Sequence, residues 1–206
     1  VTEGNSVGDS GAESRARQMS TEMNVATTEY LGDEWSFIDC PGSVELAQES
    51  FNAAMAADIT VVVCDPDAHK ALGVAPMLRF LGARQIPHII FINKIDTADA
   101  PVMDTLESLK GVSNRPLLLR EIPIHEDDHV IGHVELASGR AFKWELDKQS
   151  NLMDMPDGMQ EQYESARGEM LETLADFDDT LLEHLLEDAD PSTDETYSNL
   201  TKDVQQ

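Results

Sequence analysis

The sequence predicts an α/β fold with a mostly parallel sheet, followed by a smaller acidic region of α+β character. Strand-like and helix-like segments alternate between residues 35 and 111, which is typical of a parallel sheet whose strands are connected by helices. Two of the strand-like segments are apolar throughout. The pattern changes after residue 112, and so does the charge: residues 1–120 carry 17 acidic and 9 basic side chains, whereas residues 121–206 carry 23 and 5.

The beginning of the chain predicts a polar segment, a β-hairpin and a helix. Residues 1–22 are polar and rich in Gly and Ser, so we expect a loop or disorder there. Residues 24–30 (NVATTEY) and 35–38 (WSFI) have the β-branched and aromatic content of strands, and the short turn at 31–34 between them indicates a hairpin. Apolar side chains at helical spacing then predict a helix within residues 43–58.

Two apolar strands and two helices complete the alternation. Residues 59–64 (ITVVVC) and 88–92 (HIIFI) predict strands that are buried on both faces. One helix is expected within residues 73–87, ending near Gly82, and another within residues 101–111, between a proline and a glycine.

Polar residues follow three of the predicted strands. In open α/β sheets, ligands bind beyond the carboxyl ends of the strands. We therefore expect residues 39–42, 65–67 and 93–96 to lie at the same edge of the sheet, where a ligand would be held.

The acidic region predicts strands and then helices. Residues 115–124 read as a strand, and residues 129–146 as a hairpin that turns at 137–139. Residues 159–188 predict a long amphipathic helix that breaks near Asp176. Ser192 and Glu195 have capping-box spacing, which predicts a last short helix.

Composition limits the classes of partner. The formal net charge of −26 disfavours direct, sequence-specific binding to nucleic acid and contact with an anionic membrane, and it favours a basic protein partner or a salty milieu. The two cysteines form no disulfide framework or zinc spacing, which fits a reducing, cytoplasmic compartment. No apolar run approaches the ~18 residues of a membrane span.

The tetrad Asn93-Lys94-Ile95-Asp96 suits recognition of a guanine base. A carboxylate such as that of Asp96 accepts two N–H bonds at once, from the ring N1 and the 2-amino group of guanine, and adenine lacks the second donor. The Asn93 amide can pair with the base or join neighbouring loops, and the methylene stem of Lys94 can cover one face of the ring. A plain polar loop after a strand remains the alternative for such a short motif.

The segment Asp39-Cys40-Pro41-Gly42 suits a metal-bound phosphate. A carboxylate at a strand end can hold Mg²⁺ through water, and a glycine lets a backbone N–H approach a terminal phosphate closely. Loss of that phosphate would relax the turn and move the following helix, which is how a nucleotide switch works. The alternative is an ordinary strand–helix turn, in which Asp, Pro and Gly are all common.

Taken together, these motifs resemble the translational GTPases, and within them elongation factor G and its G-like relatives. Residues 17–30 resemble the first switch region, 38–43 the second switch and 91–96 the guanine motif, and residues 175–195 are similar to the acidic insert of that factor's GTP-binding domain. The resemblance implies a P-loop-NTPase-type sheet, GTP and Mg²⁺ as ligands, and GTP hydrolysis coupled to translocation on the ribosome during elongation.

The resemblance also assigns site residues. Thr21 matches the switch threonine that binds Mg²⁺, with a one-residue offset to Ser20 left open, and Asp39 matches the aspartate that holds Mg²⁺ through water. Gly42 matches the amide that senses the terminal phosphate. The GTP-binding residues implied by the two motifs are Asp39, Cys40, Pro41, Gly42, Ser43, Asn93, Lys94, Ile95 and Asp96.

Two departures from the family qualify this reading. The sequence contains no G-x-x-x-x-G-K-[ST] motif, so the phosphate loop and first strand are expected upstream of Val1 and the chain is expected to be an internal fragment, inactive alone. The alternative is a short protein that has lost nucleotide binding. In addition, Ser43 occupies the position of the family's catalytic histidine. Serine is shorter, so the full-length protein is expected to hydrolyse GTP slowly or by another arrangement.

The resemblance implies a division of the chain and its partners. Residues 1–118 would belong to the GTP-binding domain, 119–195 to the inserted acidic subdomain, and 196–206 to a possible return to the main domain. The ribosome is the implied partner, with the acidic insert meeting a basic ribosomal protein such as a stalk protein. A ribosome-protection or release-type GTPase would share these motifs, and a non-hydrolysing acidic ribosome-binding module would fit the missing phosphate loop.

Overall fold

The computed structural model of the protein describes residues 8–97, 101–127, 129–145, 148–187 and 189–205. Contacts divide the chain into two compact units. The first unit comprises residues 1–60 and 86–88, and the second comprises residues 61–85 and 89–206. The domain boundaries expected at residues 118 and 195 are not tested by this division and remain predictions.

The first unit is built on the predicted hairpin. Strand β1 (Asn24–Tyr30) pairs antiparallel with β2 (Asp33–Asp39), from Asn24 opposite Asp39 to Tyr30 opposite Asp33. Leu31 and Gly32 form the turn, with φ values of 53° and 90°. A two-residue turn with positive φ at both positions matches the twist of the strands, which explains why the hairpin forms here.

Helices flank this hairpin along the chain. The first unit contains α1 (Ala12–Arg17), η1 (Val44–Leu46) and α2 (Ala47–Ala54). The helix predicted within 43–58 is therefore confirmed, but the expectation of loop or disorder over 1–22 is wrong for residues 12–17. An i,i+4 ion pair between Glu13 and Arg17, with 2.8 Å between Oε1 and Nη2, supports that helical turn. Residues 1–7 lie outside the described part of the chain.

The predicted α/β alternation continues through the next elements, which confirms the fold class. In chain order they are β3 (Thr60–Cys64), α3 (Ala68–Ala71), η2 (Leu72–Val74), α4 (Ala75–Arg84), β4 (His88–Ile92), η3 (Ile95–Thr97) and α5 (Val102–Lys110). Strands β3 and β4 are paired. The Thr60 N–H donates to the Pro87 carbonyl, and the Asn93 N–H donates to the Cys64 carbonyl. The amino ends of the two strands therefore lie side by side, as do their carboxyl ends, so the pair is parallel.

The expectation that β3 and β4 are buried on both faces is wrong for the described chain. Alternate residues of β3, Val61 and Val63, are 50% and 57% exposed, and Ile89 and Phe91 of β4 are 45% and 53% exposed. Side chains alternate across a strand, so these four residues line one face of the pair. No element in the described part of the chain covers that face fully.

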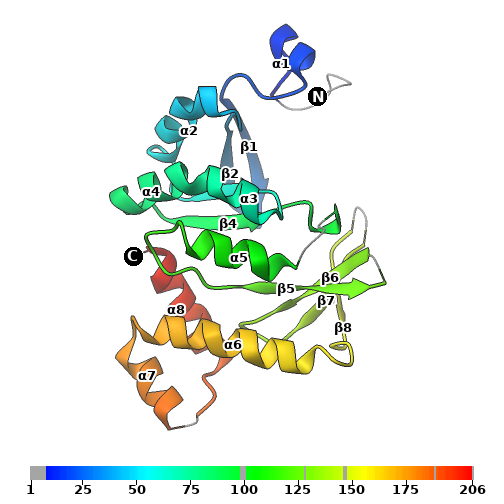
Figure 1. Ribbon diagram of the computed structural model, residues 1–206, viewed down its shortest axis with the longest axis vertical. Helices are drawn as coiled ribbons and strands as arrows, with labels where there is room; N and C mark the ends of the chain where they lie inside the picture. The colour runs from blue at the N-terminus through cyan, green and yellow to red at the C-terminus, as the bar shows by residue number, and fades with distance from the viewer. Residues whose placement is uncertain (1–7, 98–100, 128, 146–147, 188, 206) are drawn as a thin grey trace. The chain divides into compact units, whose positions relative to one another are not determined.

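The acidic region is a four-stranded antiparallel sheet packed against helices. The sheet order is β5 (Glu121–Glu126), β6 (His129–Glu135), β7 (Ala141–Lys143) and β8 (Asn151–Met153). The helices are α6 (Gln160–Ala175), α7 (Asp179–Leu186) and α8 (Thr193–Gln205). Helix α6 runs along the sheet (Figure 1), and Ile122, Val134, Met170 and Leu174 are among the side chains buried in their shared core.

The helix boundaries follow the predicted signals. Helix α6 ends at Ala175, and the Asp178 carboxylate accepts hydrogen bonds from the N–H groups of Thr180 and Leu181 to begin α7. The Ser192 hydroxyl oxygen accepts a hydrogen bond from the Glu195 N–H at 3.2 Å. The break near Asp176 and the helix after Ser192 are thus confirmed, although α8 is longer than the short helix expected.

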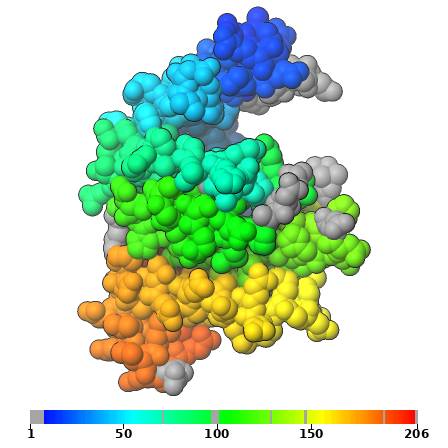
Figure 2. All heavy atoms as spheres, viewed as in Figure 1, coloured from blue at the N-terminus to red at the C-terminus, as the bar shows by residue number. Residues whose placement is uncertain are grey.

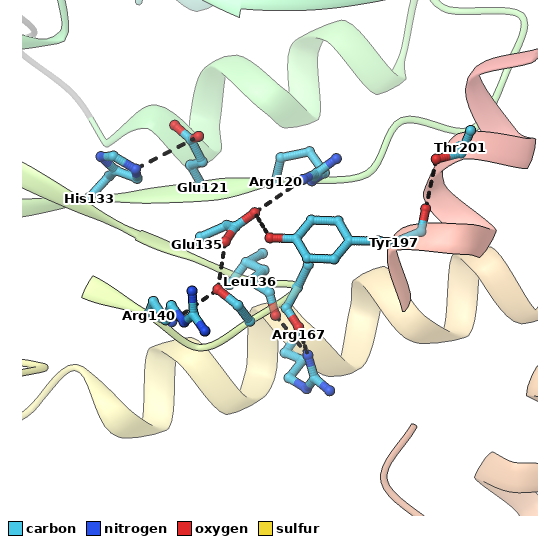
Figure 3. Close-up of polar contacts among 11 residues, drawn as sticks. Arg120, Glu121, His133, Glu135, Leu136, Arg140, Arg167, Tyr197 and Thr201 are labelled. Atoms are coloured by element: carbon cyan, nitrogen blue, oxygen red, sulfur yellow. Dashed lines mark hydrogen bonds and ion pairs between the residues drawn. The ribbon is translucent and has the colours of Figure 1, made fainter. Parts of the chain in front are cut away.

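A polar cluster joins α8 to the sheet (Figure 3). The Glu135 carboxylate accepts hydrogen bonds from the Tyr197 and Ser138 hydroxyls, both at 2.5 Å, and its Oε1 lies 3.4 Å from Nη2 of Arg120. Arg167 of α6 donates to the carbonyls of Leu136 and Ala137 at 2.8 and 2.9 Å. The turn after β6 is therefore tied to α6 through the half-buried Arg167, and to α8 through the exposed Tyr197, whose hydroxyl reaches the half-buried Glu135.

None of the helices in the described part of the chain has the length and apolar character needed to cross a lipid bilayer.

Candidate functional site

The candidate switch hydroxyls lie between α1 and β1 and have partners within the first unit. The Thr21 hydroxyl lies 2.8 Å from that of Ser14, a residue of α1 that is 1% exposed. The Ser20 hydroxyl donates to Asp9 Oδ2 at 2.8 Å. Both hydroxyls that the sequence offered for a metal are therefore hydrogen-bonded in this structure, and either would have to exchange its partner to bind a cation.

Strand pairing and a helix contact position the segment that follows Thr21. Asn24 opens β1 opposite Asp39 at the end of β2, so the chain leaving Thr21 runs beside Asp39. The Met23 N–H donates to the Glu49 carboxylate of α2 at 2.8 Å. Met23, in the segment that resembles the first switch, is thereby joined to α2, the helix that follows the segment resembling the second switch.

The predicted phosphate segment lies in the strand–helix turn after β2. Asp39 is exposed, and its carboxylate makes no hydrogen bond or ion pair with the described residues. Pro41 is buried and its carbonyl accepts a hydrogen bond from the Ser50 hydroxyl at 3.3 Å, whereas Gly42 is exposed with open space around its Cα. The turn is therefore fixed at Pro41 and open at Gly42.

Ser43 begins the helical segment after the turn. It is half-buried, and its carbonyl accepts a hydrogen bond from the Leu46 N–H at 3.0 Å, while its side chain makes no capping hydrogen bond. Cys40 remains a neutral thiol at neutral pH, because burial and the nearby Asp39 charge raise the pKa of that thiol. Neither side chain is set up as a nucleophile in this arrangement.

The predicted guanine motif lies at the carboxyl end of β4. The Asn93 N–H donates to the Cys64 carbonyl at 2.8 Å, which fixes the start of the loop against the end of β3. Lys94 has a left-handed backbone with φ of 60°, and Ile95 then opens the short helix η3. Asn93 and Asp96 are exposed, so the amide and the carboxylate are accessible to a ligand.

The charged neighbours of Lys94 lie outside the predicted guanine motif. Its ammonium lies 3.0 Å from Oδ1 of Asp65, and the ammonium of Lys70 lies 3.0 Å from Oδ2 of the same carboxylate. The prediction that residues 65–67 share an edge with residues 93–96 is thus confirmed. A signal was present: Asp65 directly follows one strand of a parallel pair and Lys94 follows the other by two residues.

The predicted site residues fall in both units. Thr21, Asp39, Gly42 and Ser43 belong to the first unit, whereas residues 93–96 belong to the second together with Asp65. The common edge for residues 39–42 and 93–96 therefore remains a prediction.

The residues that are present suit Mg²⁺ and a guanine nucleotide. Asp39 and the hydroxyls of Thr21 or Ser20 offer the oxygen ligands that Mg²⁺ prefers. Gly42 leaves room for a phosphate to approach the backbone, and Asp96 and Asn93 offer an exposed acceptor and an exposed amide. The donor set therefore fits the ligands that the sequence implied.

The acidic helices offer a second kind of surface. Helices α6 and α7, yellow to orange in Figure 2, form an exposed surface of the second unit. Carboxylates follow one another along it, including Glu161, Glu164, Glu172, Glu183 and Glu187, which are all exposed. Leu182 and Leu186 of α7 are 43% and 77% exposed beside them. Such a surface combines negative charge with apolar contacts.

Comparison with known proteins identifies similar chains. The family described as the elongation factor Tu GTP binding domain matches residues 1–190. The elongation factor G-like protein of Synechocystis sp. is 39% identical over 204 residues, which cover 99% of this chain and 30% of that protein. Elongation factor G of Gluconobacter oxydans is 28% identical over 197 residues, covering 92% of this chain and 28% of that protein. The chain thus spans less than a third of the length of these relatives.

A solved structure supports the fold. A crystal structure of a protein from Thermus thermophilus superposes with a TM-score of 0.86 at 22% sequence identity, covering 98% of this chain and 30% of that one. At this identity the likeness concerns the fold, and it confirms the predicted α/β class with its additional α+β region.

Proposed function

Because the chain belongs to the elongation factor Tu GTP-binding domain family and is an elongation factor G-like translational GTPase sequence, we propose that the full-length protein binds GTP with Mg²⁺ and acts on the ribosome in translocation during elongation. Hydrolysis of GTP would be an activity of the full-length protein, and the 206-residue chain alone would be inactive. The cytoplasm is the compartment in which we expect this activity.

One observation carries the proposal. The tetrad 93–96 stands at the carboxyl end of β4 in a parallel pair, with the Asn93 N–H bonded to the end of β3 and the side chains of Asn93 and Asp96 exposed. This is the part of an open α/β sheet at which ligands bind. An exposed carboxylate there can accept the two adjacent N–H groups of guanine.

We assign roles to the residues from this placement and from what the family resemblance implies. Asp96 reads the guanine edge, Asn93 pairs with the base or braces the loops, and Lys94 covers the ring. Asp39 would hold Mg²⁺ through water, and Thr21 or Ser20 would bind it directly. The metal would neutralise charge on the phosphates. Gly42 brings its N–H to the terminal phosphate within the segment 40–43, so loss of that phosphate would release the turn that leads into α2.

Ser43 sets the rate of hydrolysis in this proposal. Its hydroxyl is shorter than a histidine side chain and reaches less far towards an attacking water. In the full-length protein, Ser43→His should raise ribosome-stimulated hydrolysis by about 10-fold or more, because misplacing a reacting group by an ångström costs about 100-fold. Ser43→Ala is the matched control, and an unchanged rate in Ser43→His would contradict this role.

The acidic surface of α6 and α7 is our proposed contact for a basic ribosomal protein of the stalk. Its charge would steer association and weaken it at high salt. The exposed Leu182 and Leu186 would add apolar contact area. Binding of ribosomes that persists without nucleotide would favour the alternative of a non-hydrolysing acidic module.

The deciding experiment begins with the coding region on both sides of residues 1–206. The complete protein would be purified, and GTP hydrolysis would be measured with and without ribosomes, with the 206-residue chain as control. Ribosome-stimulated hydrolysis by the complete protein, coupled to movement of tRNA and mRNA, supports the proposal. Stimulated hydrolysis without movement would favour a ribosome-protection or release-type GTPase.

A further inference from the structure

Asp65 lies at the centre of a three-residue charge cluster beside the proposed guanine motif. Each of its carboxylate oxygens forms an ion pair with one lysine. Oδ1 is 3.0 Å from Lys94 Nζ, and Oδ2 is 3.0 Å from Lys70 Nζ. The Asp65 side chain is 29% exposed, whereas those of Lys94 and Lys70 are 61% and 64% exposed. Hydrogen bonds from Lys94 and then Lys70 hold the pKa of Asp65 below its usual value, so this carboxylate is ionised at neutral pH.

The backbone brings these three residues together. Asp65 follows Cys64, whose carbonyl accepts the hydrogen bond from the Asn93 N–H, and Lys94 is the next residue after Asn93. The left-handed backbone of Lys94 turns the chain immediately after the strand. Both residues are thus anchored by one main-chain hydrogen bond between parallel strands.

Helix α3 supplies the second lysine. The Asp67 carboxylate accepts hydrogen bonds from the N–H groups of His69 and Lys70 at 2.8 and 3.3 Å, which fixes the first turn of α3. Lys70 therefore projects from a capped turn that begins shortly after Asp65. The Asp65 carboxylate therefore pairs with Lys94 from the loop after β4 and with Lys70 from α3.

A contribution to global stability is a weak explanation for this cluster. Ion pairs between exposed side chains are screened by water and lose side-chain entropy, so most stabilise a fold very little. Their effect on a binding site is different. A lysine stem has many rotamers, and a site that orders it before the ligand arrives does not lose that entropy on binding.

We propose that Asp65 is a positioning residue of the guanine site, which holds the Lys94 ammonium so that the lysine stem is already placed to lie over one face of the base. This inference rests on the proposed function, because it assumes that residues 93–96 bind a guanine nucleotide. Asp65 acts through Lys94 and does not itself contact the nucleotide.

The test measures the affinity of the full-length protein for GDP carrying a fluorescent label on the ribose. Asp65→Asn keeps the shape of the side chain and removes its charge, and it should weaken binding by about 3-fold to 10-fold, as expected for lost preorganisation of one long side chain. Glu107→Gln is the matched control, because Glu107 also pairs with a lysine, Lys110, on the surface of the second unit at 2.8 Å. Asp65→Glu should restore part of the affinity.

Two further readouts separate positioning from a general structural effect. Lys94→Gln and the double variant Asp65→Asn/Lys94→Gln should bind GDP equally weakly, because without Lys94 the charge of Asp65 no longer affects the residue that covers the base. Competition with IDP, whose base lacks the 2-amino group, should show the same fold-loss as GDP in Asp65→Asn, since both bases present the same ring face to Lys94. A greater loss for GDP would place the effect at Asp96 and would overturn the inference.

The outcomes distinguish the two proposals. Wild-type protein that binds GDP while Asp65→Asn binds it as tightly overturns the inference alone, as do additive losses in the double variant. Wild-type protein that binds no GDP overturns the proposed function, and this inference with it.

Discussion

The strands of the proposed nucleotide-binding part (residues 1–120) and the sheet of the acidic part (residues 121–206) bury their side chains to very different extents. In the acidic part, Val134 and Leu136 are completely buried, and Ile122 and Ile124 are 1% exposed. In the hairpin β1–β2 and in the pair β3–β4, large side chains such as Phe37 and Phe91 are more than half exposed. The difference shows that the sheet of the acidic part has a well-buried core face, whereas β3 buries Val62 and Cys64 on one face and leaves Val61 and Val63 exposed on the other.

The two parts also differ in how their charges are arranged. The acidic part carries net charge −18 over residues 121–206, from 23 acidic and 5 basic side chains, yet its apolar core and the Glu135 cluster hold the sheet and helices together. Residues 1–120 carry net charge −8, from 17 acidic and 9 basic side chains, and the lysines Lys70 and Lys94 pair with Asp65 next to the guanine motif. Most charged side chains of the acidic part thus lie on its surface, whereas in the proposed nucleotide-binding part Asp65, Lys70 and Lys94 form a cluster beside the guanine motif.

Replacement of Gly132 is expected to have the largest effect on the free energy of unfolding. A Cβ added to this residue of β6 would overlap the Phe142 carbonyl oxygen of β7. Gly132→Ala should therefore lower the free energy of unfolding by about 3 kcal/mol, since the strands must separate. Denaturant unfolding of the 206-residue chain would measure it.

Gly168 is the matched control in the same region, because a Cβ there meets open space. Gly168→Ala should raise the stability by about 0.5–1 kcal/mol through the helix propensity of alanine. If the two substitutions had equal effects, packing around β6 would not determine the stability of the acidic part.

Two isoleucines, one buried in β5 and one half-exposed in β4, allow packing in the two parts to be compared directly. Ile124 in β5 is 1% exposed and Ile89 in β4 is 45% exposed. Ile124→Ala should cost about 3 kcal/mol in free energy of unfolding, because it leaves a cavity, and Ile89→Ala about 1 kcal/mol, because only part of its surface is buried. Urea midpoints and slopes of both variants provide the measurement, and equal losses would show that β4 is packed as tightly as β5.

The Glu135 cluster gives a smaller, pH-dependent effect. Burial opposes the charged form of Glu135, but hydrogen bonds from Ser138 and Tyr197 and the charge of Arg120 outweigh it, so the pKa of Glu135 is lowered from 4.5. The cluster therefore stabilises the fold above about pH 4.5, and this contribution is lost as the pH falls through the lowered pKa. Tyr197→Phe should cost about 1 kcal/mol at about pH 7.

The measurement is the thermal midpoint of wild type, Tyr197→Phe and Glu135→Gln between about pH 7 and about pH 3. The difference between wild type and Glu135→Gln should shrink as the solution is acidified. A constant difference across this range would mean that the charge of Glu135 does not contribute to the link between α8 and β6.

Patterns local in sequence predicted most of the fold. The hairpin at Leu31-Gly32, the break near Asp176 and the cap at Ser192 depend on neighbouring residues, and each was predicted. The exposure of Val61 and Phe91 was not, because an apolar run shows that a strand can be buried and not which elements cover it. Strand β8 was missed since its three residues, Asn151–Met153, carry no periodic signal.

The site was predicted in the same uneven way. Asn93, Lys94 and Asp96 form a contiguous motif, and their place after β4 follows from the strand pattern. The contact between Lys94 and Asp65 joins positions that are distant along the chain, so it needed the parallel pairing of β3 and β4. Similarly, the partner of Thr21 is Ser14, in a helix that the polar composition of residues 1–22 concealed.

The central measurement is the base preference of the full-length protein and of Asp96→Asn. Affinities for GDP and ADP would be measured by competition against labelled GDP. Wild type should strongly prefer GDP, and Asp96→Asn should lose GDP affinity by about 10-fold or more, because an amide cannot accept both N–H groups of guanine as a carboxylate does. Equal affinities for GDP and ADP, or an unchanged preference in Asp96→Asn, would contradict the proposed guanine site.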